Sequence, residues 1–226
     1  MGKYQIVFNK FKAISKKDTV NYAAEMMAHP YSEAEGWGYF DILRVDDTIS
    51  ATLQKRVATY YSVWNEESQQ VERQSFQIVS EVRFEMDFAH ELLIAEGSNT
   101  QLNRVKQSFR QAFWNAFTYE DVNLMPVDYI RILTDSRMLS AIGEITINDF
   151  QYEGCLIGRY TAKPTSQHDI LTKIGDNAKN IIRAKLKVNV NGEDSILTVT
   201  NKNVMALDFS EEAKEVFINY LKANIK

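Results

Sequence analysis

The alternation of hydrophobic and polar residues predicts a β-strand most clearly in the segment IIRAKLKV, residues 181–188. Apolar residues occupy its even-numbered positions, and Arg183, Lys185 and Lys187 occupy the positions between them. Because successive side chains of a strand point to opposite faces, the three cations are expected to share one face. An Asn-Gly pair at residues 191–192 then predicts a tight turn into a second strand.

Further strands are predicted wherever apolar residues alternate with polar ones or form short runs. In the segment 75–88 the apolar residues, among them Phe76 and Ile78, share one face, and polar or charged residues share the other. The expected strands are residues 3–11, 37–45, 48–64, 75–88, 90–97, 129–133, 141–147, 155–162, 181–190 and 195–200.

Amphipathic helices are predicted where apolar residues recur with a period of 3.6. Asp18 or Ser15 can cap the first helix, which Pro30 ends; its expected apolar stripe is Val20, Ala23, Ala24 and Met27. The strongest pattern places Arg104 and Arg110 on the polar surface of a helix at 98–117. The expected helices are residues 15–30, 98–117, 166–180 and 210–225.

Strand segments followed by a Ser-capped helix occur twice, at 76–117 and at 181–224. This order predicts an α+β protein with two halves, each a mainly antiparallel sheet with a packed amphipathic helix. The connector at residues 119–128 is the candidate boundary. The expected domains are an N-terminal α+β region at residues 1–120 and a C-terminal α+β region at residues 121–226.

The amino-acid composition is typical of a globular protein and includes enough apolar residues to form a core. It has 226 residues, of which 45% are hydrophobic and 25% charged. Its single cysteine, Cys155, excludes an internal disulfide and a multi-cysteine zinc site. No apolar run approaches the ~20 residues that span a bilayer, and the N-terminal segment lacks a signal-peptide core. We therefore expect a cytoplasmic protein without direct membrane insertion.

Charge is distributed unevenly, although the net charge is only −4. Residues 1–17 carry five lysines and residues 98–118 carry three cations, and neither segment contains an acid. Residues 18–97 carry 15 acids against five bases, while 155–203 carry eight bases against four acids. The basic segments can converge on one face that binds a polyanion, or they can pair with the acidic segments inside the fold.

Motifs for catalysis or cofactor binding are absent from the sequence. The histidines His29, His90 and His168 are isolated, and no phosphate-binding glycine loop or serine nucleophile elbow occurs. Carboxylates could meet by folding and hold Mg²⁺ as in a nuclease, but the acid-x-Lys signature of such enzymes is missing. The carboxylates considered are Asp41, Asp46, Asp47, Glu81 and Glu85. The sequence therefore predicts a non-enzymatic protein without a metal site or cofactor.

Binding to nucleic acid is the function that these patterns favour, with duplex DNA bound at low sequence specificity. Cations on a strand or helix face, mixed with Gln and Asn, suit contacts to phosphates and base edges. The exposed ring of either Tyr60 or Tyr61 could stack on a base. The predicted nucleic-acid-binding residues are Arg104, Arg110, Arg183, Lys185 and Lys187.

Three alternatives stay open at this point. The cations of residues 181–188 can instead protect an edge strand from pairing with other chains. The acidic segment 18–97 can dock a basic protein or mimic nucleic acid, which would make the chain an inhibitor or adaptor in protein–protein interactions. A metal-dependent nuclease is the third and weakest reading of the sequence.

The order of elements resembles that of the RexA-like phage exclusion proteins. The similarity lies in an opening strand and lysine-rich stretch that lead into a helix, KYQIVFNKFKAISKKDTVNYAAEMM, and in the following YFDILRVDDTISATL. The later LIGRYTAK and HDILTKIG are also similar. The resemblance covers the layout of most of the chain with scattered identities, and this chain is shorter. It implies a DNA-binding homodimer in phage defence, alongside a membrane partner, and transfers no catalytic residue.

Overall fold

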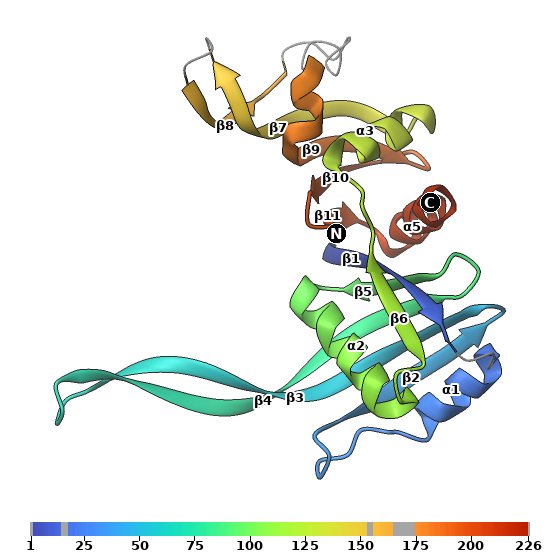
Figure 1. Cartoon of the computed structure of the whole chain (residues 1–226), viewed down its shortest axis with the longest axis vertical. Helices are drawn as coiled ribbons and strands as arrows, with labels where there is room; N and C mark the ends of the chain where they lie inside the picture. Colours follow the sequence, from blue (N-terminus) through green and yellow to red (C-terminus); the bar gives the residue numbers. More distant parts are fainter. Residues whose placement is uncertain (1, 15–17, 153–155, 165–174, 226) are drawn as a thin grey trace. The chain divides into compact units, whose positions relative to one another are not determined.

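The structure, a computed structural model, describes residues 2–14, 18–152, 156–164 and 175–225. In these residues the chain forms eleven β-strands, four α-helices and one short 3-10 helix (Figure 1). The chain is therefore broadly α+β and mostly sheet, which confirms the fold class expected from the sequence in its general form.

The elements follow one another without long irregular segments in the described residues. The strands are β1 Gly2–Ala13, β2 Trp37–Val45, β3 Thr48–Asn65, β4 Gln70–Asp87, β5 Leu92–Glu96, β6 Phe117–Asp121, β7 Leu139–Tyr152, β8 Leu156–Ala162, β9 Ile181–Val190, β10 Glu193–Thr200 and β11 Val204–Phe209. The helices are α1 Thr19–Met27, α2 Asn99–Phe113, α3 Pro126–Asp135 and α5 Glu211–Asn224, with the 3-10 helix η1 at Gly175–Asn180.

The chain divides into two compact units that interleave in sequence. Unit 1 comprises the described residues of 1–10, 96–99 and 120–226, and unit 2 comprises those of 11–95 and 100–119. Strand β1 contributes to both units, and the hydrogen-bonded order is β2-β3-β4-β5-β1-β11-β10-β9-β7-β8, with β6 also paired to β1. The two expected halves are therefore not separate sheets, while the boundary after residue 120 stays a prediction.

Unit 2 contains the antiparallel strands β2, β3 and β4, on which α1 and α2 pack. The Phe109 ring of α2 lies 5.2 Å from the Phe84 ring of β4, and the Tyr39 hydroxyl of β2 donates a 2.8 Å hydrogen bond to Ser108. Tyr22 of α1 stacks on Phe88 in the same aromatic core. Alternation in the strands therefore supplies one apolar face, which the two helices cover.

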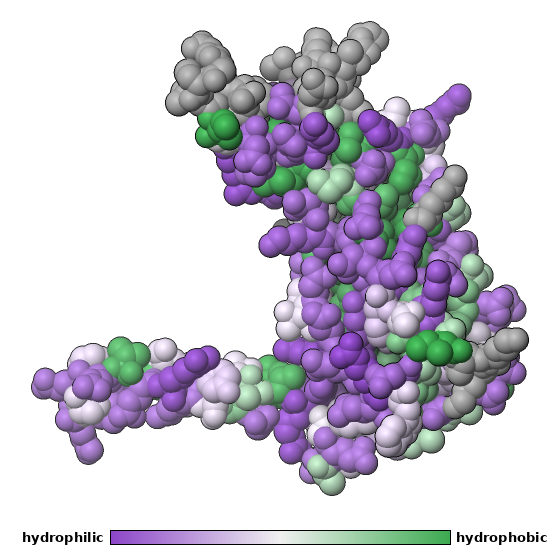
Figure 2. All heavy atoms as spheres, viewed as in Figure 1, coloured by the Kyte–Doolittle hydropathy of each residue, from purple (hydrophilic) through white to green (hydrophobic). Residues whose placement is uncertain are grey.

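Strands β3 and β4 continue beyond the helix-covered core as a two-stranded ribbon, residues 55–80. The pairing of β3 with β4 runs without a break from Thr48–Asp87 to Asn65–Gln70, whereas β2 pairs with β3 only as far as Lys55. Figure 1 shows the ribbon projecting away from the rest of unit 2. None of its residues is buried, and Figure 2 shows hydrophobic and hydrophilic residues mixed along it.

Unit 1 contains β11, β10, β9, β7 and β8 beside the first residues of β1, with α3 and α5 packed on one face. The Phe217 ring of α5 lies 5.2 Å from the Phe209 ring of β11. Leu186, Leu197 and Leu207 of three neighbouring strands are buried on this side. The opposite face carries the side chains that alternate with them, and this face contains the cations of β9.

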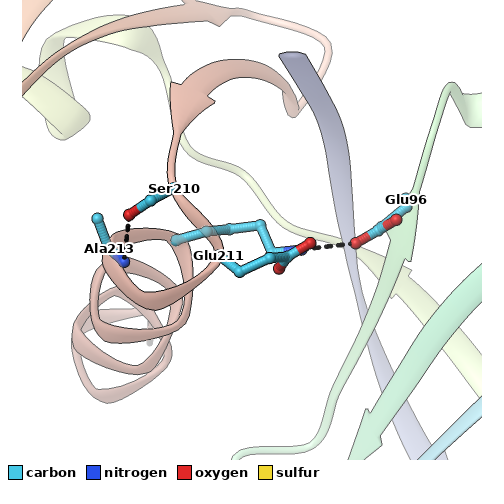
Figure 3. A network of polar contacts seen from close by, with 5 residues as sticks. Glu96, Ser210, Glu211 and Ala213 are labelled. Carbon is cyan, nitrogen blue, oxygen red and sulfur yellow. Dashed lines mark hydrogen bonds and ion pairs between the residues drawn. The ribbon is translucent and has the colours of Figure 1, made fainter. Parts of the chain in front are cut away.

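Helix α5 is fixed to unit 1 by a polar network at its first turn (Figure 3). The Lys214 ammonium donates to Glu96 at 2.8 Å and to Glu211 at 2.6 Å, and it lies 4.1 Å from the centre of the Tyr4 ring. Burial alone would lower the pKa of Lys214, but the two carboxylates outweigh it and raise that pKa above its usual value. Ser210 caps the helix by accepting from the Ala213 amide, as the sequence predicts.

The prediction of a strand at residues 129–133 is wrong, because this segment lies in α3. Pro126 occupies the first turn of the helix, and the Asp128 carboxylate accepts a hydrogen bond from the Met125 amide. Ile130 and Leu133 then face the core with helical spacing. A short apolar run fits both a buried strand and a buried helix, so the capping residues were the better signal.

Two further helix predictions need correction. In α1, Asp18 is the cap as expected, but Val20, Ala24 and Met27 are exposed and the buried residues are Tyr22, Ala23 and Met26. Helix α2 ends at Phe113 instead of residue 117, because Trp114 and Asn115 both have positive φ. The helix predicted at 166–180 falls largely outside the described residues, as does Cys155.

Candidate nucleic-acid interface

The alternation predicted for residues 181–188 is confirmed in β9 from residue 183 onward, whereas at its start Ile181 is buried and Ile182 is half-buried. Ala184, Leu186 and Val188 are buried, and the side chains of Arg183, Lys185 and Lys187 are exposed on the opposite face. The hairpin is also confirmed: Asn191 and Gly192 have φ values of 52° and 86°, as a two-residue hairpin turn requires. Local sequence therefore determines which face of the sheet carries the three cations.

Strand β9 is an interior strand, not an edge strand. It pairs with β10 from Val190–Glu193 to Arg183–Thr200, and with β7 on its other side. Cations that protect a sheet from edge-to-edge pairing belong on strands with an unpaired side. The edge-protection reading of residues 181–188 is therefore wrong, and the exposed cations need another explanation.

The three cations lie on the face of unit 1 that α3 and α5 do not cover, which we call the open face. Their neighbours on β10 and β7 are mostly small or hydroxyl-bearing. Glu144 lies opposite Lys185, but its carboxylate reaches Arg183 at 3.9 Å. Within the described residues, neither Lys185 nor Lys187 takes part in an ion pair. The cross-strand neighbours are Ala141, Glu144 and Thr146 on β7, and Ile196, Thr198 and Thr200 on β10.

Besides Glu144, two acidic residues of the same face lie farther from the cations, Asp194 and Asp208. Asp194 lies beside the hairpin turn, where it accepts a 2.6 Å hydrogen bond from Asn189. Asp208 of β11 shares the face with Ala206, which pairs with Thr198. The positive charge of the open face is therefore concentrated along the β9 residues from Arg183 to Lys187.

Arg104 and Arg110 lie on α2 in unit 2. The Arg104 guanidinium donates a 2.9 Å hydrogen bond to the Ser80 hydroxyl of β4, so it is partly buried against the ribbon root. Burial lowers the pKa of the neighbouring Lys55 ammonium, and the charge of Arg104 lowers it further. Arg110 is exposed. These groups create a positive potential along α2, since residues 98–118 contain no acid.

The surface of α2 is rich in amides and ends in an exposed indole. The side chains of Asn103, Gln107 and Gln111 are exposed, and Lys55 donates to Gln107 at 3.3 Å. Trp114, just beyond the helix, is 89% exposed. Sequence reasoning missed Trp114 because it treated the helix as continuous through residue 117; the Trp-Asn pair at its true end was the available signal.

The predicted binding residues therefore belong to different units. Arg183, Lys185 and Lys187 lie together on the open face of unit 1, and Arg104 and Arg110 lie on α2 of unit 2. Convergence of all basic segments on one surface stays a prediction. Each of the two surfaces is a candidate interface by itself.

Both tyrosines proposed for base stacking are accessible. Tyr60 is 54% exposed and Tyr61 is 45% exposed, on opposite faces of the ribbon. The Arg73 guanidinium lies 4.1 Å from the centre of the Tyr60 ring, and Tyr61 packs edge-on against Phe76. Exposed aromatic rings beside an arginine suit stacking on unpaired bases.

The chemistry of a metal-dependent nuclease finds no support in the described side chains. No cluster of three or more His, Cys, Asp or Glu side chains could hold a metal ion in the part of the chain that the structure describes. Among the carboxylates considered, Glu81 accepts a hydrogen bond from Gln54. His90 lies 3.0 Å from Asp87, His29 stacks on Trp37, and His168 lies outside the described residues.

A polar hollow of about 380 Å³ lies at the root of the ribbon in unit 2. Lys55 and Arg56 line it together with Glu33 and Glu35, so its charges are balanced and favour neither an anion nor a cation. Its lining residues are Glu33, Ala34, Glu35, Gly36, Trp37, Lys55, Arg56, Gln77 and Gln111.

Comparison with known proteins adds no identity. No protein-family model matches the chain, and no curated protein matches it in sequence. Among the described helices, none is long and apolar enough to cross a membrane.

Proposed function

We propose that the chain is a non-enzymatic nucleic-acid-binding protein that contacts duplex DNA with low sequence specificity through the open face of unit 1. The observation that carries this proposal is the exposure of Arg183, Lys185 and Lys187 on an interior strand. Arg104 and Arg110 on α2 would form a second contact surface.

Electrostatics supports a polyanionic ligand for the open face. Cations two residues apart on a strand have Cα atoms about 6.6 Å apart, so their mutual repulsion is only partly screened in physiological salt. The single ion pair from Arg183 to Glu144 leaves Lys185 and Lys187 to be compensated by solvent ions. DNA phosphates would replace those ions, and counterion release would then favour the complex.

The composition of the open face supports backbone contacts over base reading. Thr198 and Thr200 lie beside Lys185 and Arg183, and their hydroxyls can donate to phosphate oxygens. The described strands present a sheet face here, whereas direct reading of bases in duplex DNA requires an element that enters a groove. Weak dependence on sequence follows from this arrangement.

The resemblance to RexA-like phage exclusion proteins is compatible with this proposal. It would add a cytoplasmic role in phage defence or exclusion, a homodimeric state and a phage or prokaryotic origin. A protein-interaction module is the second candidate, and the exposed apolar side chains of the ribbon are the observation that favours it. The two functions can coexist, because the ribbon and the open face belong to different units.

Charge reversal on β9 tests the proposal. We expect Lys185→Glu with Lys187→Glu to weaken binding to labelled duplexes of any sequence by more than tenfold at low salt. The slope of log affinity against log salt should fall by about 2, since each lost phosphate contact contributes about 0.9. Fluorescence anisotropy at several salt concentrations, with duplex and single-stranded oligonucleotides, measures both quantities.

The matched control places the same charge change on the helix-covered side of unit 1. Arg131→Glu with Arg137→Glu alters α3 and the residue after its cap, both exposed. This variant should retain most of the affinity and the parental salt slope. Equal losses in the two folded variants, or no binding by the parent protein at low salt, would contradict the assignment of the open face.

A further inference from the structure

The ribbon of residues 55–80 exposes more apolar surface than a two-stranded hairpin keeps in water without a partner. Tyr61, Phe76 and Ile78 are 45%, 46% and 40% exposed, and Trp64 and Val71 are 58% and 65% exposed. Two-stranded hairpins without a covered face are marginally stable, and large exposed apolar patches mark interaction sites. The ribbon is therefore expected to bind another surface.

Residues that lie opposite each other in an antiparallel pair share a face, so the ribbon has two faces of different character. The inner ribbon face continues from the buried pair Leu53–Val82 of the core. It has a cation at its root, an acid near its tip and an apolar stripe between them. Its pairs are Lys55–Ser80, Val57–Ile78, Thr59–Phe76, Tyr61–Gln74 and Val63–Glu72.

The outer ribbon face carries two cations, Arg56 and Arg73, and no acid among its strand pairs. A second copy of this face would supply no carboxylate to either arginine, so charge disfavours its self-association. Its pairs are Arg56–Val79, Ala58–Gln77, Tyr60–Ser75, Ser62–Arg73 and Trp64–Val71.

The charges of the inner ribbon face are complementary under a twofold rotation. Lys55 and Val63 each lie four positions from Thr59, and Ser80 and Glu72 each lie four positions from Phe76. A twofold axis that runs across the strands through the Thr59–Phe76 pair would therefore place Lys55 of one copy over the Val63–Glu72 pair of the other, within reach of the Glu72 carboxylate on the neighbouring strand. In the described chain neither residue has an ion-pair partner: Lys55 donates to Gln107, and Glu72 accepts from Asn65.

We propose that the inner ribbon face binds the same face of a second copy of this chain, with the two ribbons antiparallel. Thr59 and Phe76 lie at the twofold axis, and two symmetric ion pairs join Lys55 to Glu72. This proposal rests on the ribbon alone, independently of nucleic-acid binding by the open face. The interface is isologous, as in most homodimers.

The local electrostatics of unit 2 fits an incoming carboxylate. The positive charge of Arg104 disfavours the protonated form of Lys55, so an acid beside Lys55 would relieve repulsion at the ribbon root. At the tip of the ribbon, the negative charges of Glu66 and Glu67 would repel the phosphates of a nucleic acid. A second copy therefore fits the charges of the ribbon better than DNA does.

The size of the inner ribbon face sets the strength of the expected dimer. Nine strand positions span about 30 Å. Half-exposed Tyr61 and Phe76 each have on the order of 100 Å² left to bury. The contact therefore buries less than the ~800 Å² per partner of standard interfaces, so a dimer that dissociates on dilution into the micromolar range is expected.

Charge exchange between the two positions tests the arrangement directly. Sedimentation velocity over a wide dilution series should show a monomer–dimer equilibrium for the parent protein. Glu72→Lys or Lys55→Glu alone places like charges together twice per dimer and should raise the dissociation constant at least tenfold. The double variant restores opposite charges and should recover most of the loss.

Two matched variants distinguish this surface from others. Glu66→Lys makes the same charge change in the turn, and Trp64→Ser removes an exposed ring from the outer ribbon face; both should dimerise like the parent. Circular dichroism verifies that each variant is folded. A parent protein that stays monomeric at all concentrations overturns the proposal, whether or not the ribbon is found to bind an oligonucleotide or another protein. So does a dimer indifferent to the Lys55 and Glu72 variants.

Discussion

At the scale of single residues, Ser210 connects a helix cap to a titratable group. Its hydroxyl accepts a hydrogen bond from the Ala213 amide and donates one to the Glu193 carboxylate, which also accepts from the Ser210 amide. These hydrogen bonds from Ser210 lower the pKa of Glu193. A carboxyl group with a lowered pKa stabilises the fold at pH values above its unfolded pKa, and this contribution disappears as the pH falls through its folded pKa.

We therefore expect Ser210→Ala to reduce the free energy of unfolding by about 1 kcal/mol at neutral pH, as for other helix caps. The deficit relative to the parent should become smaller as the pH falls through the lowered pKa of Glu193, because the carboxyl group is then protonated in the folded state as well as in the unfolded state. Urea denaturation at neutral and acidic pH measures the difference. Ser140→Ala, on an exposed strand position, is the control; an equal deficit at both pH values would contradict the coupling.

At the scale of elements, the close packing of residues 30–31 against the start of β2 depends on a glycine. A Cβ atom on Gly38 would collide with the backbone of Tyr31 and Pro30, where the chain passes close before β2 begins. A Cβ atom on Gly158 of β8, in contrast, would meet no atom within 4 Å. Because these are backbone atoms and not the end of a flexible side chain, an added Cβ atom would force the whole segment to shift and would disturb its packing.

We expect Gly38→Ala to destabilise the protein by about 3 kcal/mol or more, the upper range for overpacking. Gly158→Ala should change stability by less than about 1 kcal/mol. Chemical denaturation of both variants checks the contrast. A Gly38→Ala protein as stable as the Gly158→Ala protein would show that the 30–32 segment can shift away from β2.

The strands were largely predictable because each alternates between a core face and a polar face. Local alternation also located the cations of β9 correctly. It could not reveal that β9 is interior, because its partner β7 is distant in sequence. Alternation likewise continues into the ribbon, so Phe76 and Ile78 looked like core residues although no helix covers them. Tertiary packing determines how far the helices cover a strand, and a local sequence pattern does not encode this.

At the scale of the whole molecule, the ribbon should be dispensable for folding. None of its residues is buried, so its removal leaves the core of unit 2 intact. Replacing residues 58–77 with Asn-Gly would join the paired residues Val57 and Ile78 through a two-residue hairpin turn. We expect the shortened protein to melt within about 4 °C of the parent, to bind DNA with similar affinity, and to be monomeric.

Thermal melting by circular dichroism, anisotropy and sedimentation test these three expectations separately. If the shortened protein still dimerises but no longer binds DNA, the nucleic-acid site would lie on the ribbon and not on the open face. Retention of the dimer would show that a different surface joins the two copies.

The pairing of β1 with β11 has a consequence for the biosynthesis of the protein. Gly2 pairs with Phe209 and Val7 with Val204, a separation of about 200 residues. During translation, β1 leaves the ribosome long before its partner exists, and its edge stays available to other strands for that time. The entropy of closing so long a loop grows only slowly with length, but contacts of this range form late. The pairing of β1 in unit 1 therefore has to wait until β11 has been synthesised.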